Sequence, residues 1–183
     1  MYIVILRAVA AGALLVASIG GTAAQQPAPQ PAQPPNPQRT TATYDDWVVR
    51  CEIQAGPPQQ KICDMAQLAQ VQGQANPISR VGIAKPAKGE AVKLVIQLPV
   101  NVSVPGGVKI QADDKDPGLM APFKRCIPAG CFAEVDLKDD TMKKFRAAAQ
   151  PLKMHLKDGG EHDVAIPLSL KGFAQAYDSL MKQ

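Results

Sequence analysis

Several features of catalytic and nucleic-acid-binding proteins are missing from this 183-residue chain. Its 20 Lys and Arg against 16 Asp and Glu leave a net charge of only +4. That excludes a dedicated nucleic-acid binder, because such proteins cluster Lys and Arg densely. The chain has no glycine-rich phosphate loop, no G-x-S-x-G nucleophile elbow and no C-x-x-C motif for redox or metal chemistry. We therefore expect no cofactor and no bound metal.

Candidates for metal or acid–base chemistry are few. His155 and His162 fall on opposite faces of the expected strands and cannot share a metal ion, so we interpret both as surface residues. Residues 113–116 (Asp-Asp-Lys-Asp) look like part of a calcium loop but lack its Gly and distant Glu, which favours a polar turn. A pair of carboxylates for hydrolysis stays an open alternative, because its spacing is set in space and not in sequence.

The first 24 residues have the organisation of a secretory signal peptide. Arg7 provides the positive start, residues 8–19 form an uncharged run rich in Ala, Leu and Val, and residues 20–24 offer small side chains for cleavage near Ala24. The apolar run is shorter than the roughly 20 residues that cross a bilayer. We expect an exported protein, periplasmic or associated with the outer surface, with no transmembrane segment in the mature chain.

The segment after the signal peptide differs in composition from the rest. Residues 25–40 are rich in Pro, Gln and Ala and lack the apolar side chains of a core. They are predicted to form a disordered, polyproline-like linker. The folded domain is expected to span residues 41–183.

The four cysteines all lie in this domain. An even number of cysteines behind an export signal predicts disulfides. Of the three possible pairings we favour Cys51–Cys63 and Cys126–Cys131, because each pair brackets a short segment that contains a turn. A metal site is the alternative, and the spacing does not favour it.

Alternating apolar residues predict half-buried β-strands along most of the domain. Residues 47–51 and 62–68 are expected to pair across a Gly-Pro-Pro loop. The longest alternating run begins at Val92. It is predicted to turn at Pro-Gly-Gly and return as a hairpin in which Val104 pairs with Val108.

A second hairpin is predicted near the C-terminus. A loop of residues 159–161 places Leu156 opposite Val164 on the buried face and Lys157 opposite Asp163 on the solvent face. A two-residue Gly-Gly turn would instead set Leu156 against a carboxylate. We therefore expect the longer loop.

Two short helices complete the expected fold. Asp139 or Asp140 is predicted to cap a helix that runs to about Ala149, and Ser169 to cap a last helix with an apolar stripe. The predicted fold class is mainly β, an antiparallel β-sandwich or barrel-like domain. It would have seven to nine short strands and two short α-helices, stapled by disulfides.

One electrostatic asymmetry stands out between residues 138 and 157. The basic residues there are Lys138, Lys143, Lys144, Arg146, Lys153 and Lys157. They are candidates for contact with an envelope or host-surface protein or with a polyanion. A solvated helix face is the alternative interpretation.

Six short motifs follow one another in a recognisable order. They are W-V-V-R-C (47–51), C-D-M-A-Q (63–67), P-G-G-V (105–108), F-K-R-C (123–126), G-C-F-A (130–133) and I-P-L-S-L-K-G-F (166–173). Residues 41–183 thereby resemble the invasion-associated locus B family of exported bacterial proteins. The resemblance implies a periplasmic or surface-associated protein without established catalytic residues, in a family with members linked to host-cell invasion.

The resemblance and the residues together favour a non-enzymatic binding domain of the cell envelope, with a role in host-cell invasion. Two alternatives stay open. The first is a periplasmic hydrolase that uses paired carboxylates, and the second is a structural or stress-related envelope protein.

Overall fold

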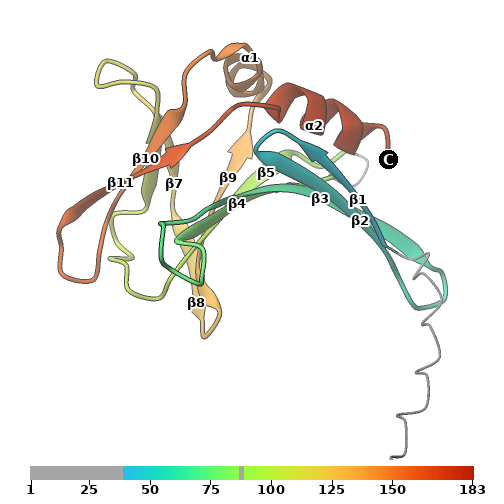
Figure 1. Ribbon diagram of the computed structural model, residues 1–183, viewed down its shortest axis with the longest axis horizontal. Helices are drawn as coiled ribbons and strands as arrows, with labels where there is room; N and C mark the ends of the chain where they lie inside the picture. Colours follow the sequence, from blue (N-terminus) through green and yellow to red (C-terminus); the bar gives the residue numbers. More distant parts are fainter. Residues whose placement is uncertain (1–38, 87–88) are drawn as a thin grey trace, which may run out of the picture. The chain divides into compact units, whose positions relative to one another are not determined.

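The structure is a computed structural model that describes residues 39–86 and 89–183 (Figure 1). The expected signal peptide and residues 25–38 of the expected linker lie outside this range. Arg39 and Thr40, which the composition assigns to the linker, begin a strand instead. They pair with Glu52 and Cys51 of the next strand, so the folded domain starts at least two residues earlier than expected.

The larger of two antiparallel sheets has seven strands in the order β1-β2-β3-β4-β5-β9-β8. Strands β1 to β5 follow one another as a meander, because each pairs with its successor along the chain. The strands are β1 (Arg39–Tyr44), β2 (Trp47–Gln54), β3 (Gln60–Ala69), β4 (Ser79–Ala84), β5 (Val92–Leu98), β8 (Phe123–Ile127) and β9 (Gly130–Leu137).

The smaller sheet has four strands in the order β11-β10-β6-β7. Two helices accompany the sheets, α2 over the β1–β3 part of the larger sheet and α1 beyond the end of β9 (Figure 1). These elements are β6 (Val108–Gln111), β7 (Leu119–Ala121), β10 (Leu152–Lys157), β11 (Asp163–Leu168), α1 (Asp139–Ala147) and α2 (Phe173–Met181).

The expected fold class is confirmed: the domain is mainly β, antiparallel and sandwich-like, with two short helices. The barrel form of that expectation is not realised, because β1 and β8 end the larger sheet without pairing with each other. The described residues form eleven strands, against an expected seven to nine. The unexpected ones are short or polar, such as the Thr-rich β1 and the three-residue β7.

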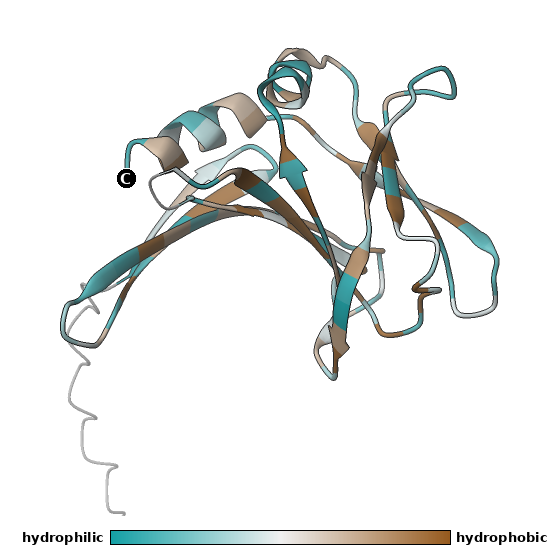
Figure 2. Cartoon of the chain, turned by 180° about the vertical axis from the view of Figure 1, so that it is seen from behind, coloured by the Kyte–Doolittle hydropathy of each residue, from teal (hydrophilic) through white to brown (hydrophobic). Residues whose placement is uncertain are grey.

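The core lies where the inward faces of both sheets and helix α2 meet. Trp47 and Val49 of β2 and Leu94 and Ile96 of β5 are almost completely buried, while the residues between them are at least partly exposed. Figure 2 shows the resulting alternation of hydrophobic and hydrophilic residues along the strands. Burial of one face of most strands is the main driving force for this fold, whereas the edge strands β1 and β8 have no fully buried residue.

Both disulfides join neighbouring strands of the larger sheet. Cys51 of β2 is bonded to Cys63 of β3, and Cys126 of β8 to Cys131 of β9. In each case the two cysteines are direct cross-strand partners. The sheet is therefore stapled, as expected for the fold class, once near each of its edges.

Trp47 connects the first hairpin to the C-terminal segment. Its indole Nε1 donates a hydrogen bond of 3.0 Å to the carbonyl oxygen of Ser169. The Gln67 amide donates to the same oxygen and accepts from the Ser169 N–H, at 3.0 and 2.9 Å. The ring of Trp47 also meets that of Phe173 edge-to-face at 5.2 Å. This cluster positions the start of α2 on the larger sheet.

The predicted C-terminal hairpin is confirmed in register. Strands β10 and β11 pair Leu156 with Val164 and Lys157 with Asp163. The Lys157 Nζ lies 3.2 Å from a carboxylate oxygen of Asp163 on the solvent face.

The predicted hairpin between Val104 and Val108 is wrong. Strand β5 belongs to the larger sheet and β6 to the smaller one, so the chain passes between sheets after Leu98. Pro99 begins this crossing and Pro122 marks the return from β7 to β8. Proline has no N–H for a sheet ladder, which explains why the strands end there.

The predicted helix caps are also wrong. Helix α1 has Lys138 at its N-cap position. Asp139 and Asp140 lie in its first turn, where their negative charges stabilise the helix by interacting with its dipole. Helix α2 has Gly172 at its N-cap, with φ of 75°. A side chain at this glycine would collide with the carbonyl group of Tyr44. A serine three residues earlier cannot replace it, because the close approach requires glycine.

Candidate functional site

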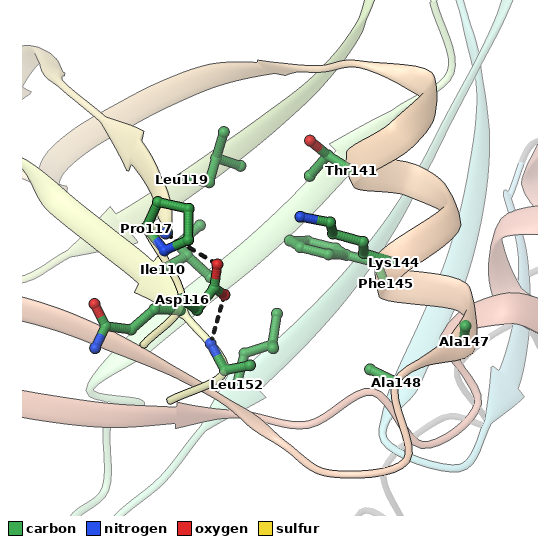
Figure 3. Close-up of a pocket in the computed structure, with 13 residues that line it drawn as sticks. Ile110, Asp116, Pro117, Leu119, Thr141, Lys144, Phe145, Ala147, Ala148 and Leu152 are labelled. Carbon is green, nitrogen blue, oxygen red and sulfur yellow. Dashed lines mark hydrogen bonds between the residues drawn. The ribbon is translucent and has the colours of Figure 1, made fainter. Parts of the chain in front are cut away.

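A cavity of about 470 Å³ opens between helix α1 and the loop that joins β6 to β7 (Figure 3). Four apolar side chains form its wall: Ile110 from β6, Leu119 from β7, Phe145 from α1 and Leu152 from β10. Ile110, Phe145 and Leu152 are buried parts of the core. The wall joins four elements that are distant in the sequence, so it exists only in the folded domain.

Two polar side chains of α1 line the same cavity. Thr141 and Lys144 are three residues apart, which places them on one face of the helix. Figure 3 shows Lys144 extending from the helix toward Asp116 on the opposite side. Within the described part of the chain Lys144 forms no ion pair. Its ammonium group is available to a ligand.

Asp116 is held in place by the backbone of its own loop. One carboxylate oxygen accepts a hydrogen bond of 2.9 Å from the Ala112 N–H, and the other accepts one of 3.1 Å from the Gly118 N–H. These bonds lower the pKa of Asp116 below its ordinary value, and the nearby charges of Lys144 and Lys109 lower that pKa further. The carboxylate is therefore ionised at neutral pH and has no proton to donate.

Residues 113–116 form a polar turn in the structure. Asp113 accepts hydrogen bonds from the backbone N–H groups of Lys115 and Asp116, at 2.8 and 3.1 Å. The carboxylates of Asp113 and Asp116 thus order the loop, and Asp116 carries its charge to the edge of the cavity.

The six predicted basic residues are divided between two elements and differ in their partners. Lys138 to Arg146 lie on α1 or at its start, whereas Lys153 and Lys157 lie on β10. Three of them have acidic partners: Lys143 with Asp140 at 3.7 Å, Arg146 with Asp178 at 2.7 Å and Lys157 with Asp163 at 3.2 Å. The remaining three, Lys138, Lys144 and Lys153, have no ion pair with a described residue.

The pair of Arg146 and Asp178 joins the two helices. The guanidinium donates two hydrogen bonds to the carboxylate, at 2.7 and 3.1 Å. This contact lowers the pKa of Asp178 and raises that of Arg146. Arg146 therefore has a structural partner, and only Lys144 among the six basic residues lines the cavity.

Neither histidine lies in this cavity. His155 is half-buried on β10, and its Nε2 has no hydrogen-bond partner within the described residues. His162 lies in the β10–β11 loop, where its Nδ1 is 3.1 Å from a carboxylate oxygen of Asp158. In residues 39–86 and 89–183 no three His, Cys, Asp or Glu side chains are grouped to hold a metal ion.

Two carboxylates lie together in a second hollow, of about 570 Å³, on the outer face of the larger sheet. They are Glu52 and Asp64, which both line this hollow and so bear on the alternative of a hydrolase with paired carboxylates. Each has an arginine partner, however: Glu52 is 3.1 Å from Arg39, and Asp64 is hydrogen-bonded to Arg80. Both carboxylates therefore already take part in ion pairs with neighbouring strands of the sheet.

Asp116 and Thr141 were not identified as site residues from the sequence. The sequence predicts a polar turn at residues 113–116, but it does not indicate what that turn faces. The cavity depends on packing α1 against β6, β7 and β10, which no local pattern reveals. Lys144 was identified, but as one member of a basic patch.

No helix within the described residues is long and apolar enough to cross a membrane.

Comparison with known families and structures gives consistent results. The sequence profile of the family described as Invasion associated locus B (IalB) protein matches residues 47–181. Two Invasion protein B homologs of Brucella abortus, from strain 2308 and from biovar 1 strain 9-941, are each 27% identical over 140 residues. These alignments cover 75% of this chain and 77% of each relative.

A solved structure shows the same fold. It is the crystal structure of invasion associated protein b from Bartonella henselae, with a TM-score of 0.66 and 25% sequence identity. The match covers 78% of this chain and 95% of that one. The family profile, at residues 47–181, spans this chain from β2 to α2 and includes the residues that line the cavity beside α1.

Proposed function

Because the chain belongs to the invasion-associated locus B (IalB) protein family, we propose that it is an exported, non-catalytic binding domain of the cell envelope that contributes to host-cell invasion. The cavity beside α1 is its proposed binding site. The names of its relatives describe invasion proteins, and the chemistry of the cavity supports binding.

One observation carries this proposal: the cavity combines an apolar wall with charged groups that are arranged for contact and not for proton transfer. Small-molecule and peptide sites are commonly apolar hollows with a few polar groups that orient the ligand. Asp116 is ionised, and two backbone N–H groups hold it. Acid–base catalysis would instead use a group whose pKa lies near the working pH.

The two disulfides support a location outside the cytoplasm, because such bonds persist in oxidising compartments. We propose that the signal peptide is removed near Ala24 and that the mature protein acts in the periplasm or at the outer surface. Its partner would be an envelope or host-surface protein, or a polyanion.

Site-directed crosslinking in intact cells tests the binding site. A photo-reactive residue at Thr141, at the cavity, is compared with one at Lys124 on β8, in the full chain. We expect a discrete crosslinked species from position 141 only. Lys144→Met should reduce its yield, whereas Lys143→Met, the neighbouring lysine that does not line the cavity, should not. Equal crosslinking from both positions, or no effect of Lys144→Met, would contradict the proposal.

The role in invasion needs a separate measurement. A strain without the gene should enter host cells less often than its parent, and the wild-type gene should restore entry. Complementation with the Lys144→Met gene should restore it less well. Undiminished entry by the deletion strain would contradict this part of the proposal.

A further inference from the structure

The cavity beside α1 presents opposite charges on its two sides. Lys144 projects from α1, and Asp116 lies across from it on the β6–β7 loop (Figure 3). Their charges interact, since Lys144 lowers the pKa of Asp116, yet they are not within the 4.0 Å of a salt bridge among the described residues. Each charge is thus left to meet a counter-charge from a ligand.

Both groups keep unused hydrogen-bonding capacity. A carboxylate has about four acceptor sites, and the Ala112 and Gly118 N–H groups occupy two of those on Asp116. The ammonium group of Lys144 has three donors. The Thr141 hydroxyl on the same helix face can donate or accept one more bond.

The wall between these charges is apolar. Ile110, Leu119, Phe145 and Leu152 face the space that a ligand would fill. Its volume of about 470 Å³ falls within the roughly 300–1,000 Å³ that is typical of small-molecule sites. An aliphatic or aromatic side chain placed there would remove its own surface and that of the wall from water.

The charge pattern discriminates between ligand classes. A purely anionic ligand would meet Lys144 but would lie against the ionised Asp116, and a purely cationic one would have the opposite conflict. An uncharged apolar ligand would cover Lys144 and the free acceptor sites of Asp116 without offering either a counter-charge. A ligand with both charges and an apolar side chain meets every wall of the cavity.

We propose that the cavity binds an apolar amino acid or short apolar peptide in its zwitterionic form. Lys144 and Thr141 would contact its carboxylate, Asp116 its ammonium group, and the apolar wall its side chain. This inference rests on the proposed binding function, because it names the ligand class of the same site.

Calorimetric titration of the full chain tests the ligand class. The probes are L-leucine, L-phenylalanine and the dipeptide Leu-Leu, compared with N-acetyl-L-leucine, L-leucinamide and glycine. We expect the three apolar zwitterions to bind, and loss of either charge to weaken binding by about tenfold, as expected for a charge-assisted hydrogen bond. Glycine should not bind measurably. The affinities of leucine and Leu-Leu are then compared. Tighter binding of leucine would identify a free amino acid as the ligand, and tighter binding of Leu-Leu would identify a peptide.

Variants assign the two charges. Lys144→Met should weaken the binding of leucine by about tenfold, because leucine has the carboxylate that Lys144 contacts. The variant should not weaken leucinamide, a cation that loses a like-charged neighbour. Asp116→Asn should weaken the binding of leucine but not that of N-acetyl-leucine, whose carboxylate loses a like-charged neighbour. Lys143→Met is the matched control and should not alter any affinity. Thermal unfolding of each variant verifies that it is folded.

Two results would overturn this inference. One is N-acetyl-leucine binding as tightly as leucine, which would indicate an anion site without a role for Asp116. The other is the absence of heat for every apolar zwitterion with a folded wild-type chain. Should crosslinking at Thr141 still depend on Lys144 in that case, the ligand class would be wrong while the proposed binding function would stand.

Discussion

Trp47 is the residue through which the first hairpin and the C-terminal segment are held together. It is fully buried, and its indole bonds to the Ser169 carbonyl. We expect Trp47→Ala to lower the free energy of unfolding by about 3–5 kcal/mol, as for other large-to-small core changes. Trp47→Phe keeps a ring against Phe173 but loses the hydrogen bond, and should cost about 1–2 kcal/mol. Urea unfolding followed by circular dichroism measures both. Equal losses for the two variants would show that the ring contributes little.

Asp116 makes part of the stability depend on pH. Its pKa in the folded state lies below the ordinary value of 3.8 because of its backbone hydrogen bonds. Its stabilising contribution is therefore complete above about pH 3.8 and is lost as the pH falls through the lower folded pKa, because the unfolded state then binds the extra proton.

The variant Asp116→Asn removes this titration. As the pH falls below about 3.8, the unfolding free energy of this variant should decrease less steeply than that of the wild type. Asp114→Asn is the control, because it removes the same charge from the same loop without removing these hydrogen bonds. Parallel pH profiles for wild type and Asp116→Asn, measured by urea unfolding, would refute this expectation.

At the scale of elements, each disulfide closes a loop between two adjacent strands. In the chain-entropy description a bridge that spans 12 residues stabilises more than one that spans 5. The double variant Cys51→Ala with Cys63→Ala should therefore lose about 3 kcal/mol, and Cys126→Ala with Cys131→Ala about 2 kcal/mol. Urea unfolding of each variant measures the loss. A wild type that unfolds at the same urea concentration with and without strong reductant would argue against both values.

The sequence was sufficient for elements whose partners are close along the chain. The β10–β11 register followed from counting the loop residues and from placing the positive Lys157 opposite the negative Asp163. The same reasoning failed at Val104 and Val108, where a similar Pro-Gly-Gly signal lies in a crossing between sheets. Alternation shows that a residue faces a core, but not which sheet supplies the neighbouring strand. The N-caps failed for a related reason, since Gly172 is required by the distant Tyr44.

The candidate site was predictable only in part. Lys144 belongs to a run of basic residues that the sequence displays openly. Its counterpart Asp116 comes from a different loop, and the wall includes Leu152 from a third segment. Such a site needs the tertiary packing of segments that are separated along the chain, and one sequence alone does not contain that information in a local form.

At the scale of the whole molecule, the pairing of charges determines how strongly the basic residues act at a distance. Three of them have acidic partners, and the other three have none within residues 39–86 and 89–183. The salt concentration that elutes the protein from heparin should therefore decrease more when the unpaired set is removed than when the paired set is removed. Each change removes three positive charges, so the two variants have the same net charge. The two variants are Lys138, Lys144 and Lys153 all to Gln, and Lys143, Arg146 and Lys157 all to Gln. Equal elution would indicate that net charge alone governs retention.

Both sulfur bridges lie within the seven-stranded sheet, and neither reaches across to the four-stranded one. Apart from the continuous chain, the two layers thus adhere through side-chain packing and through the hydrogen bonds at Ser169, directly after β11. Formation of the two disulfides therefore stabilises the seven-stranded sheet but does not link it covalently to the four-stranded one. A mechanical pull that separates the layers would meet side-chain packing and the hydrogen bonds of Trp47 and Gln67 to Ser169, but no covalent cross-link between the sheets.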